Sequence, residues 1–403
     1  MSVALEPPPA TEASIADAIL TAGADGVPLR IEGNNSKFPL MRPVQAARSL
    51  STGGLVGISL YSPNEMILTA GAGTPLADIE AAVAAKGQHL IAEPPDFGVL
   101  LGTHSAQTIG GIVATNLSGP RRVAWGATRD HVMGLRAVNG LGETIHSGGR
   151  VLKNVTGLDL CKLLTGSHGT LAVLTEVTLR LLPAPERRAT LVLPGLDPVR
   201  GVAALAAALG SPYSVSAAAY LPADMAARVP ALAWVNGPVA LARIEDFASF
   251  VAYRSERLRA DLAVFAAAEI LDDGASRAAW QAVRDAAPLA SKPGAIWRVS
   301  VRPSAGPAIA RAAAALGATW FMDWGGGLVW IAGPATEQAH HAVAAAARQS
   351  GGTWTLFRAP EGLRAAVDVI PAEAPVLAGI ARAVKAAFDP RGILNPGRLS
   401  AGT

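Results

Sequence analysis

The stretch Thr108-Ile109-Gly110-Gly111-Ile112-Val113-Ala114-Thr115-Asn116 decides the fold. Its paired glycines let the backbone approach a flat ligand closely, and the small residues after them leave room for a ring system. Two more glycine-rich loops lie in the same half of the chain, Gly33-Asn34-Asn35-Ser36-Lys37 and Gly166-Ser167-His168-Gly169-Thr170. Three such loops in one domain are difficult to explain by packing alone, so this half is expected to hold a ligand.

The loop Gly33-Asn34-Asn35-Ser36-Lys37 is the first candidate for a phosphate site. A strand expected over residues 28–32 runs into this bend, which offers backbone N–H groups, two amides, a hydroxyl and a lysine cation. Such a nest suits a pyrophosphate, because the backbone donates hydrogen bonds and Lys37 adds charge. Taken alone, a Gly-Asn-Asn bend is more often only a turn.

The sequence has no standard dinucleotide fingerprint. The nearest match is Gly71-Ala72-Gly73, but Thr74 and Pro75 follow directly and there is no third glycine, so it does not open a Rossmann phosphate turn. We interpret it as a strand-to-helix turn, with Thr74 as the N-cap of a helix that runs to about Lys86.

The composition is that of an ordinary globular protein. The chain has 403 residues, of which 50% are hydrophobic and 16% charged, enough for two or three domains. Its 34 Lys and Arg are spread along the sequence, which argues against a nucleic-acid partner. A single cysteine, Cys161, excludes an internal disulfide and an iron-sulfur cluster ligated by this chain alone. With no signal peptide and no apolar run long enough to span a bilayer, a cytoplasmic location is expected.

The domain organisation is expected to be α+β. Alanine-rich blocks alternate with short runs of Val, Ile and Leu, and Pro183-Ala184-Pro185-Glu186 breaks the chain after a long strand. We therefore expect a first domain over residues 1–185. Residues 186–385 are expected to form an antiparallel sheet covered by helices on one face, and residues 386–403 an extended closing tail.

An ordered set of motifs resembles the FAD-binding domain of the vanillyl-alcohol-oxidase class, also called PCMH-type. The resemblance is strong over residues 25–185, and the tail over residues 388–397 is similar to the ending shared by 2-hydroxy-acid dehydrogenases of that class. Within the class, Glu93-Pro94-Pro95 and Gly119-Pro120-Arg121-Arg122 resemble the FAD-binding subunits of glycolate oxidases. The matching motifs are residues 33–37, 71–76, 94–95 and 108–111, Lys153-Asn154 with Gly157 and Asp159, and residues 166–171.

The resemblance implies a two-lobed FAD-binding domain followed by a cap. It places the pyrophosphate on residues 33–37 and on Gly110-Gly111. It places the flavin ring and ribityl chain near Thr103, Thr108, Ala114 and Asn116, and the adenine against the backbone of Val173 and Leu174, where a strand edge offers N–H and C=O groups.

The resemblance also implies partners. It implies that the chain works beside a second, catalytic FAD-binding subunit and an iron-sulfur subunit, in a complex that oxidises a small 2-hydroxy acid such as glycolate to glyoxylate. Any association with a membrane is expected to go through those partners.

Two departures from the class pattern change the expectation. Covalently flavinylated members carry a histidine in the first glycine loop, whereas this loop has Asn34, Asn35 and Ser36, so a non-covalent FAD is predicted. The metal-binding His-x-Gly-Asp-Gly-Asn-like segment of catalytic relatives is not found. His340 and His341 lie in an alanine-rich helix with no acidic residue at ligand-like spacing, so a surface helix is favoured over a metal site and no metal is predicted.

The remaining histidines and arginines leave alternatives open. His104 is the candidate proton acceptor, although a structural role is favoured for it and for His131, His146 and His168. Arg298, Arg302 and Arg358, on or beside expected cap strands, could bind a substrate carboxylate. A tryptophan-rich core or subunit interface with arginines at its rim is the favoured alternative.

Three functions remain open at this stage. The first is an electron-transferring FAD subunit of a glycolate dehydrogenase complex, which the missing histidine segment favours. The second is a self-sufficient 2-hydroxy-acid dehydrogenase, and the third is a scaffold that keeps the flavin only for folding.

Overall fold

The computed structural model describes residues 8–149 and 157–401; Lys153 and Asn154 of the motif set lie outside these residues. In the first half, strand β8 (Ala172–Pro183) lies at the centre of an antiparallel sheet with the order β3-β4-β8-β6-β7, and β5 pairs with its end. Eight of the twelve residues of β8 are buried, as expected for a central strand. The elements around it are β3 (Ile58–Ser62), β4 (Ile67–Gly71), α2 (Leu76–Ala84), β5 (Gln88–Leu90), α3 (Gly98–Leu101), α4 (Ile109–Thr115), α5 (Arg122–Trp125), α6 (Thr128–His131), β6 (Val132–Asn139), β7 (Thr144–Gly148) and α7 (Leu160–Leu164).

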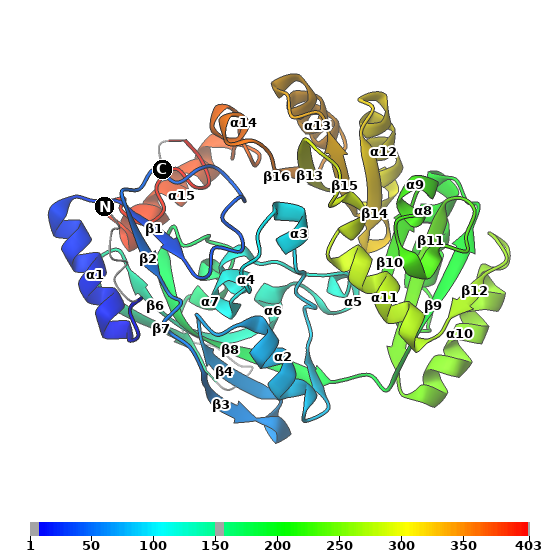
Figure 1. Cartoon of the computed structure of the whole chain (residues 1–403), viewed down its shortest axis with the longest axis horizontal. Helices are drawn as coiled ribbons and strands as arrows, with labels where there is room; N and C mark the ends of the chain where they lie inside the picture. Colours follow the sequence, from blue (N-terminus) through cyan, green and yellow to red (C-terminus); the bar gives the residue numbers. More distant parts are fainter. Residues whose placement is uncertain (1–7, 150–156, 402–403) are drawn as a thin grey trace.

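A smaller lobe packs on this sheet and contains both ends of the described chain (Figure 1). It has α1 (Glu12–Asp25) and the parallel pair β1 (Leu29–Glu32) and β2 (Arg48–Ser51). Ile15, Ile19 and Ala22 recur at helical spacing on the buried face of α1. The tail joins this lobe through a parallel bridge between Leu29 and Leu394.

The second half is one eight-stranded antiparallel sheet with the order β12-β9-β11-β10-β14-β15-β13-β16. Helices α8, α10, α12 and α13 pack on one face (Figure 1), and α9 and α11 pack on the other. The expected antiparallel sheet is confirmed, but helices do not cover one face alone. Its elements are β9 (Arg187–Pro194), α8 (Pro198–Leu209), β10 (Val215–Leu221), α9 (Ala223–Ala226), β11 (Val239–Asp246), α10 (Ala248–Leu262), β12 (Glu269–Leu271), α11 (Asp273–Arg284), β13 (Ala295–Ser300), α12 (Gly306–Ala315), β14 (Thr319–Asp323), η5 (Trp324–Gly326), β15 (Leu328–Gly333), α13 (Glu337–Gln349) and β16 (Thr353–Arg358).

This sheet contains a structural duplication. The order β9-α8-β10-β11-α10-β12 is repeated as β13-α12-β14-β15-α13-β16, and in both units the fourth strand lies beside the first. Each unit is therefore a β-α-β-β-α-β fold, and the two meet where β10 pairs with β14. The sequence shows no matching repeat of fixed period, because what the units share is topology.

The other face of the cap sheet packs against the first half. Its apolar side chains include Phe321 and Trp330, which share a cluster with Phe97 and Leu100 of the first half. The rings of Phe97 and Trp330 lie 5.4 Å apart. This contact layer fixes the cap over the glycine-rich half.

The chain returns to the first half through α14 (Glu361–Ala366) and α15 (Pro375–Phe388), which lie beside the small lobe (Figure 1). Lys385 Nζ donates to the carbonyl oxygens of Thr170, at 2.7 Å, and Leu394, at 3.0 Å. The carbonyl of Phe388 accepts from Gly140 N. The return therefore begins before residue 386, where the tail was expected to start. Among the described residues, no helix combines the length and apolar character needed to cross a membrane.

One expected cap is wrong. Helix α2 begins at Leu76 with Pro75 at the N-cap position, and it ends at Ala84. Thr74 Oγ1 instead donates to the carbonyl of Gly71 at 2.7 Å and accepts from Gly57 N at 3.0 Å. Its hydroxyl therefore stabilises the strand-to-helix turn rather than the helix end.

Candidate functional site

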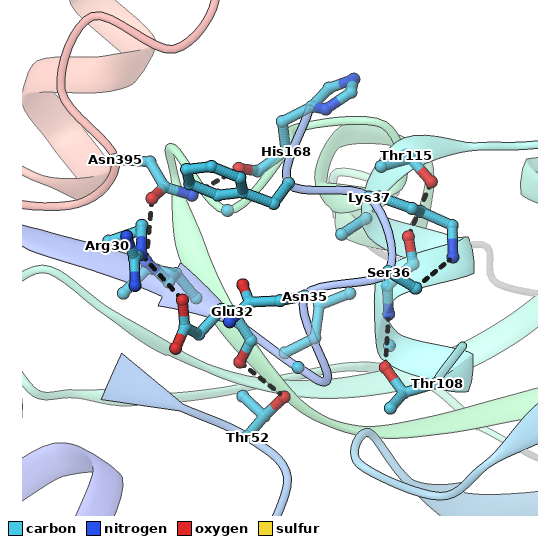
Figure 2. Close-up of a pocket in the computed structure, with 18 of the residues that line it drawn as sticks. Arg30, Glu32, Asn35, Ser36, Lys37, Thr52, Thr108, Thr115, His168 and Asn395 are labelled. Carbon is cyan, nitrogen blue, oxygen red and sulfur yellow. Dashed lines mark hydrogen bonds and ion pairs between the residues drawn. The ribbon is translucent and has the colours of Figure 1, made fainter. Parts of the chain in front are cut away.

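A cavity in the first half brings together the loop at residues 33–37, the start of α4, the turn at residues 168–169 and the tail. Arg30, Glu32 and Asn395 lie on one side of it, and Ser36, Lys37 and Thr108 on the other (Figure 2). Its lining also includes Ile31, Gly33, Asn34, Asn35, Phe38, Val44, Thr52, Gly110, Gly111, Ala114, Thr115, His168, Gly169, Ala172, Leu174 and Arg398.

Neighbouring backbone holds the loop at residues 33–37 in place. Asn35 adopts a left-handed conformation (φ 59°), which asparagine tolerates better than most residues. Asn34 Nδ2 donates to the carbonyl of Ala106 at 3.1 Å, and Thr103 Oγ1 donates to the carbonyl of Ser36 at 2.9 Å. The segment at residues 103–107 therefore clamps the loop against α4.

Lys37 gives this cavity a cation without an ion-pair partner in the described part of the chain. Its Nζ donates to Gln107 Oε1 at 3.0 Å and lies 3.4 Å from Ser36 Oγ. Burial lowers the pKa of Lys37 to about 8, against the opposing field of Asp96. An anion in the cavity would offset this desolvation, so the site fits a phosphate-bearing ligand.

The two glycines at the start of α4 have different roles. A Cβ on Gly110 would lie 2.7 Å from Ala72 Cβ and 2.8 Å from the Ala72 carbonyl oxygen, so this glycine lets α4 pack closely on the end of β4. A Cβ on Gly111 would be 3.9 Å from Lys37 Nζ, so it borders the cavity. Thr108 Oγ1 caps the helix by accepting from Gly111 N.

The tail supplies two cavity residues that the sequence interpretation missed. Asn395 Oδ1 accepts from Ile31 N and its Nδ2 donates to the His168 carbonyl, both at 2.8 Å. The Arg398 guanidinium donates to backbone carbonyls, including that of Lys37 at 3.3 Å. Burial lowers the pKa of Arg398 to about 10. The tail motif pointed to this segment, but no local pattern showed which side chains turn toward the loop.

Most of the predicted cofactor residues are brought together and three are not. Ten line the cavity: Gly33, Asn34, Asn35, Ser36, Lys37, Thr108, Gly110, Gly111, Ala114 and Leu174. Thr103 lies behind the loop that it holds, and Asn116 ends α4, where its Oδ1 accepts from Arg129 N. Val173 packs into the core with α1.

The backbone at Val173 and Leu174 is only partly a strand edge. Both residues pair with β6, opposite Val138 and Ala137. On the other side of β8, pairing with β4 reaches only Glu176. The open side of β8 therefore faces the cavity at Ala172 and Leu174, which both line it.

The histidines divide between surface and interior. His104 is exposed and has no hydrogen bond or ion pair with the described residues. His168 lines the cavity in a left-handed conformation (φ 54°), and burial lowers its pKa to about 3, so it is neutral. His340 corrects the surface-helix interpretation, because it is buried and its Nδ1 accepts from Trp297 Nε1 at 3.2 Å. Across the described residues no group of three or more His, Cys, Asp and Glu could hold a metal.

The Glu93 corner and the run Gly119-Pro120-Arg121-Arg122 join the two halves. Glu93 accepts from Arg243 of the cap, and Arg121 donates from Nε and Nη2 to both carboxylate oxygens of Glu245, at 2.8 Å each. Arg243 Nη2 also lies 3.3 Å from Glu245 Oε1. Burial alone would raise the pKa of Glu93, but Arg243 and Arg121 hold it below its usual value.

Comparisons with known proteins agree with this geometry. Residues 8–148 match the family model described as FAD binding domain, and residues 371–399 match FAD linked oxidases, C-terminal domain. Glycolate oxidase subunit GlcE of Escherichia coli is 35% identical over 382 residues, which cover 94% of each chain. Glycolate oxidase subunit GlcD of Bacillus subtilis is 40% identical over 115 residues, 28% of this chain and 23% of the relative.

The fold is also that of solved PCMH-type structures. p-Cresol methylhydroxylase has a TM-score of 0.72 at 13% identity and covers 97% of this chain and 87% of its own. 4-Ethylphenol oxidase from Gulosibacter chungangensis has a TM-score of 0.70 at 13% identity, and the match covers 98% of this chain and 88% of the oxidase. The chain therefore belongs to the family of FAD-linked oxidoreductases that includes glycolate oxidase subunit GlcE, and FAD is its cofactor.

Proposed function

We propose that this chain is the FAD-binding subunit of a glycolate oxidase complex, in which electrons from a small 2-hydroxy acid pass through flavin to an iron-sulfur partner. The observation that carries the proposal is the similarity to GlcE over 94% of both chains. The cavity around Lys37 supports it, because its cation and glycine-rich walls suit the diphosphate of FAD.

The chain's own residues would hold the cofactor. Lys37 and Arg398 would face the diphosphate, Gly111 would leave space beside it, and the open side of β8 at Leu174 would receive the adenine. When bound, FAD supplies the ability to take up two electrons and release them singly, which suits an acid donor and an iron-sulfur acceptor.

We also propose that the FAD is non-covalent. The loop at residues 33–37 has no histidine. The histidine that lines the cavity, His168, lies in a different loop. Chain freed of flavin should recover its visible spectrum when FAD is added. If the flavin can be removed from the chain only by breaking a covalent bond, the FAD is not held non-covalently.

The test of the proposed function compares the complex with the isolated chain. The chain is purified from its native source with whatever accompanies it, and glycolate is added without oxygen. We expect a cysteine-rich iron-containing protein and a second flavoprotein in the same particle, and loss of flavin absorbance in the complex. A chain that purifies alone, with flavin that glycolate does not reduce, would contradict the proposal.

The self-sufficient dehydrogenase is the second candidate. One observation favours it: the guanidinium groups of Arg122 and Arg298 lie between the two halves and have no acceptor among the described residues. Rapid loss of flavin absorbance in the isolated chain with glycolate or lactate would establish it. His104 as proton acceptor and the cytoplasmic location stay predictions.

A further inference from the structure

Two arginines from different halves of the molecule lie over one tryptophan ring. Arg122 begins α5 in the first half and Arg298 lies on β13 of the cap. Their guanidinium carbons are 4.6 Å and 4.8 Å from the centroid of the Trp324 ring. Arg298 pairs in register with Trp330 on the sheet face that packs against the first half. The cluster therefore lies between the two halves.

These two arginines differ from the other shielded arginines of the described chain. Neither the Arg122 guanidinium nor the Arg298 guanidinium has a hydrogen bond or ion pair with a described residue. The other arginines that are not exposed all have acceptors. Arg30, Arg121, Arg136, Arg188, Arg243, Arg254 and Arg284 pair with carboxylates, and Arg42, Arg358, Arg364 and Arg398 donate to backbone carbonyls.

The two cations also disfavour each other. Burial, and then the nearby charge of Arg122, lower the pKa of Arg298 to about 10. Burial also lowers the pKa of Arg122, against the opposing charge of Asp130. Stacking on tryptophan offsets only part of such a cost. Five N–H donors on each guanidinium remain available to an anion.

The neighbouring carboxyl does not neutralise them. Asp323 is 3% exposed and forms no ion pair with Arg298. Its Oδ1 accepts from the backbone N of Trp324 at 2.7 Å. Burial raises the pKa of Asp323 to about 7, so near neutral pH the site keeps a positive charge.

Trp324 is held in place from both halves. Its Nε1 donates to the Gly119 carbonyl at 3.2 Å, which ties it to the run that contains Arg122. Its backbone is left-handed (φ 53°), an unfavourable conformation for a bulky residue. Such strain persists where surrounding structure imposes it, often at ligand sites.

We propose that Arg122 and Arg298, on the Trp324 ring, bind the carboxylate of a small organic acid between the two halves of this chain. The choice of a 2-hydroxy acid rests on the proposed function. A planar carboxylate accepts two parallel N–H donors from a guanidinium and can bridge two of them. Arg302, which is exposed, and Arg358, which donates to the carbonyls of Leu100 and Lys292, are not part of the site.

The test measures binding to the isolated FAD-loaded chain by calorimetry, without oxygen. The probes are glycolate and glycolamide, which has the same shape but no charge. We expect glycolate to bind at least tenfold more tightly. Arg122→Gln and Arg298→Gln should each raise the dissociation constant of glycolate about tenfold or more. The matched control Arg302→Gln removes an exposed cap cation and should change nothing.

Several results would overturn the proposal. The first is that glycolate and glycolamide bind with equal affinity. The second is that both variants keep their FAD and bind glycolate as tightly as the parent chain does. The third is that inorganic phosphate competes for the site as well as glycolate does. If a variant fails to fold, the comparison of the two probes on the parent chain decides. The proposed function fails separately, because glycolate binding here needs neither turnover nor partners.

Discussion

Arg243 donates from Nη1 and Nη2 to the two carboxylate oxygens of Glu93, at 2.9 Å each. The two residues lie 150 positions apart, one on the cap sheet and the other at a corner of the first half. Arg243 is almost fully buried, and the pair is continuous with the Arg121–Glu245 pair. The contact between the halves is therefore a buried ion network inside an apolar layer.

Breaking this network should destabilise the whole chain. Glu93→Gln leaves the buried Arg243 beside a neutral amide, and removal of one partner from a buried pair costs about 3 kcal/mol or more. Urea unfolding of the FAD-loaded protein measures the loss in free energy of unfolding. The control Arg48→Ala removes the exposed Arg48–Asp25 pair and should cost less than about 1 kcal/mol. Equal effects of the two substitutions would show that the network adds no stability.

Lys37→Met should weaken FAD binding. The substitution removes the half-buried cation whose Nζ lies beside Ser36 and Gln107. Losing a charged hydrogen bond to phosphate should raise the dissociation constant of FAD about tenfold or more. Titration of the flavin-free chain with FAD measures it. Lys86→Met, at an exposed position of the same half, is the control and should bind as the parent does. Parent-like affinity in Lys37→Met would remove the lysine from the site.

Gly110→Ala should be more harmful than its size suggests. The new Cβ would come within 2.8 Å of the Ala72 carbonyl oxygen, so α4 would have to move away from β4 and shift the cavity wall. Such overpacking costs about 1–3 kcal/mol. Gly362→Ala, where nothing lies within 4 Å, is the matched control. Thermal unfolding with and without FAD compares them, and identical midpoints would refute the close-packing role.

Asp323 should make stability depend on pH in one direction. Its carboxyl has a pKa of about 7 in the folded protein, whereas an unfolded aspartate titrates near 4. Between about pH 4 and 7 the Asp323 carboxyl ionises in the unfolded chain but stays protonated in the folded chain. The free energy of unfolding therefore falls over this range and levels off above it. The charged groups acting on it are Glu93, Arg243 and Arg298.

Asp323→Asn removes this titration. The variant's advantage in free energy of unfolding should grow by roughly 4 kcal/mol between pH 4 and 8. Urea unfolding of parent and variant across that range gives the difference directly. A constant difference would show that the pKa of Asp323 is not raised in the folded protein.

The sequence was sufficient for features that are local. The glycine loops and the antiparallel sheet of the second half follow from turn residues and hydrophobic periodicity. It was insufficient where distant segments meet. Arg398 reaches the carbonyl of Lys37 across 361 residues, and no spacing rule connects them.

Burial was the other quantity that the sequence could not give. His340 lies on an alanine-rich helix that looks like a surface helix, but its side chain turns to Trp297 in the cap core. Thr74 precedes a helix as a capping residue should, yet its hydroxyl finds Gly71 and Gly57 first. A tertiary contact decides the position of His340, whereas Thr74 forms a local hydrogen bond within its turn as well as the contact with Gly57.

Flavin release tests the central claim most directly. The purified chain is denatured in acid, and the flavin in the supernatant and in the pellet is measured by absorbance. One FAD per chain in the supernatant, with a colourless pellet, is the predicted result. A chain that carries no flavin, or a pellet that stays yellow, would contradict a dissociable FAD in the cavity around Lys37.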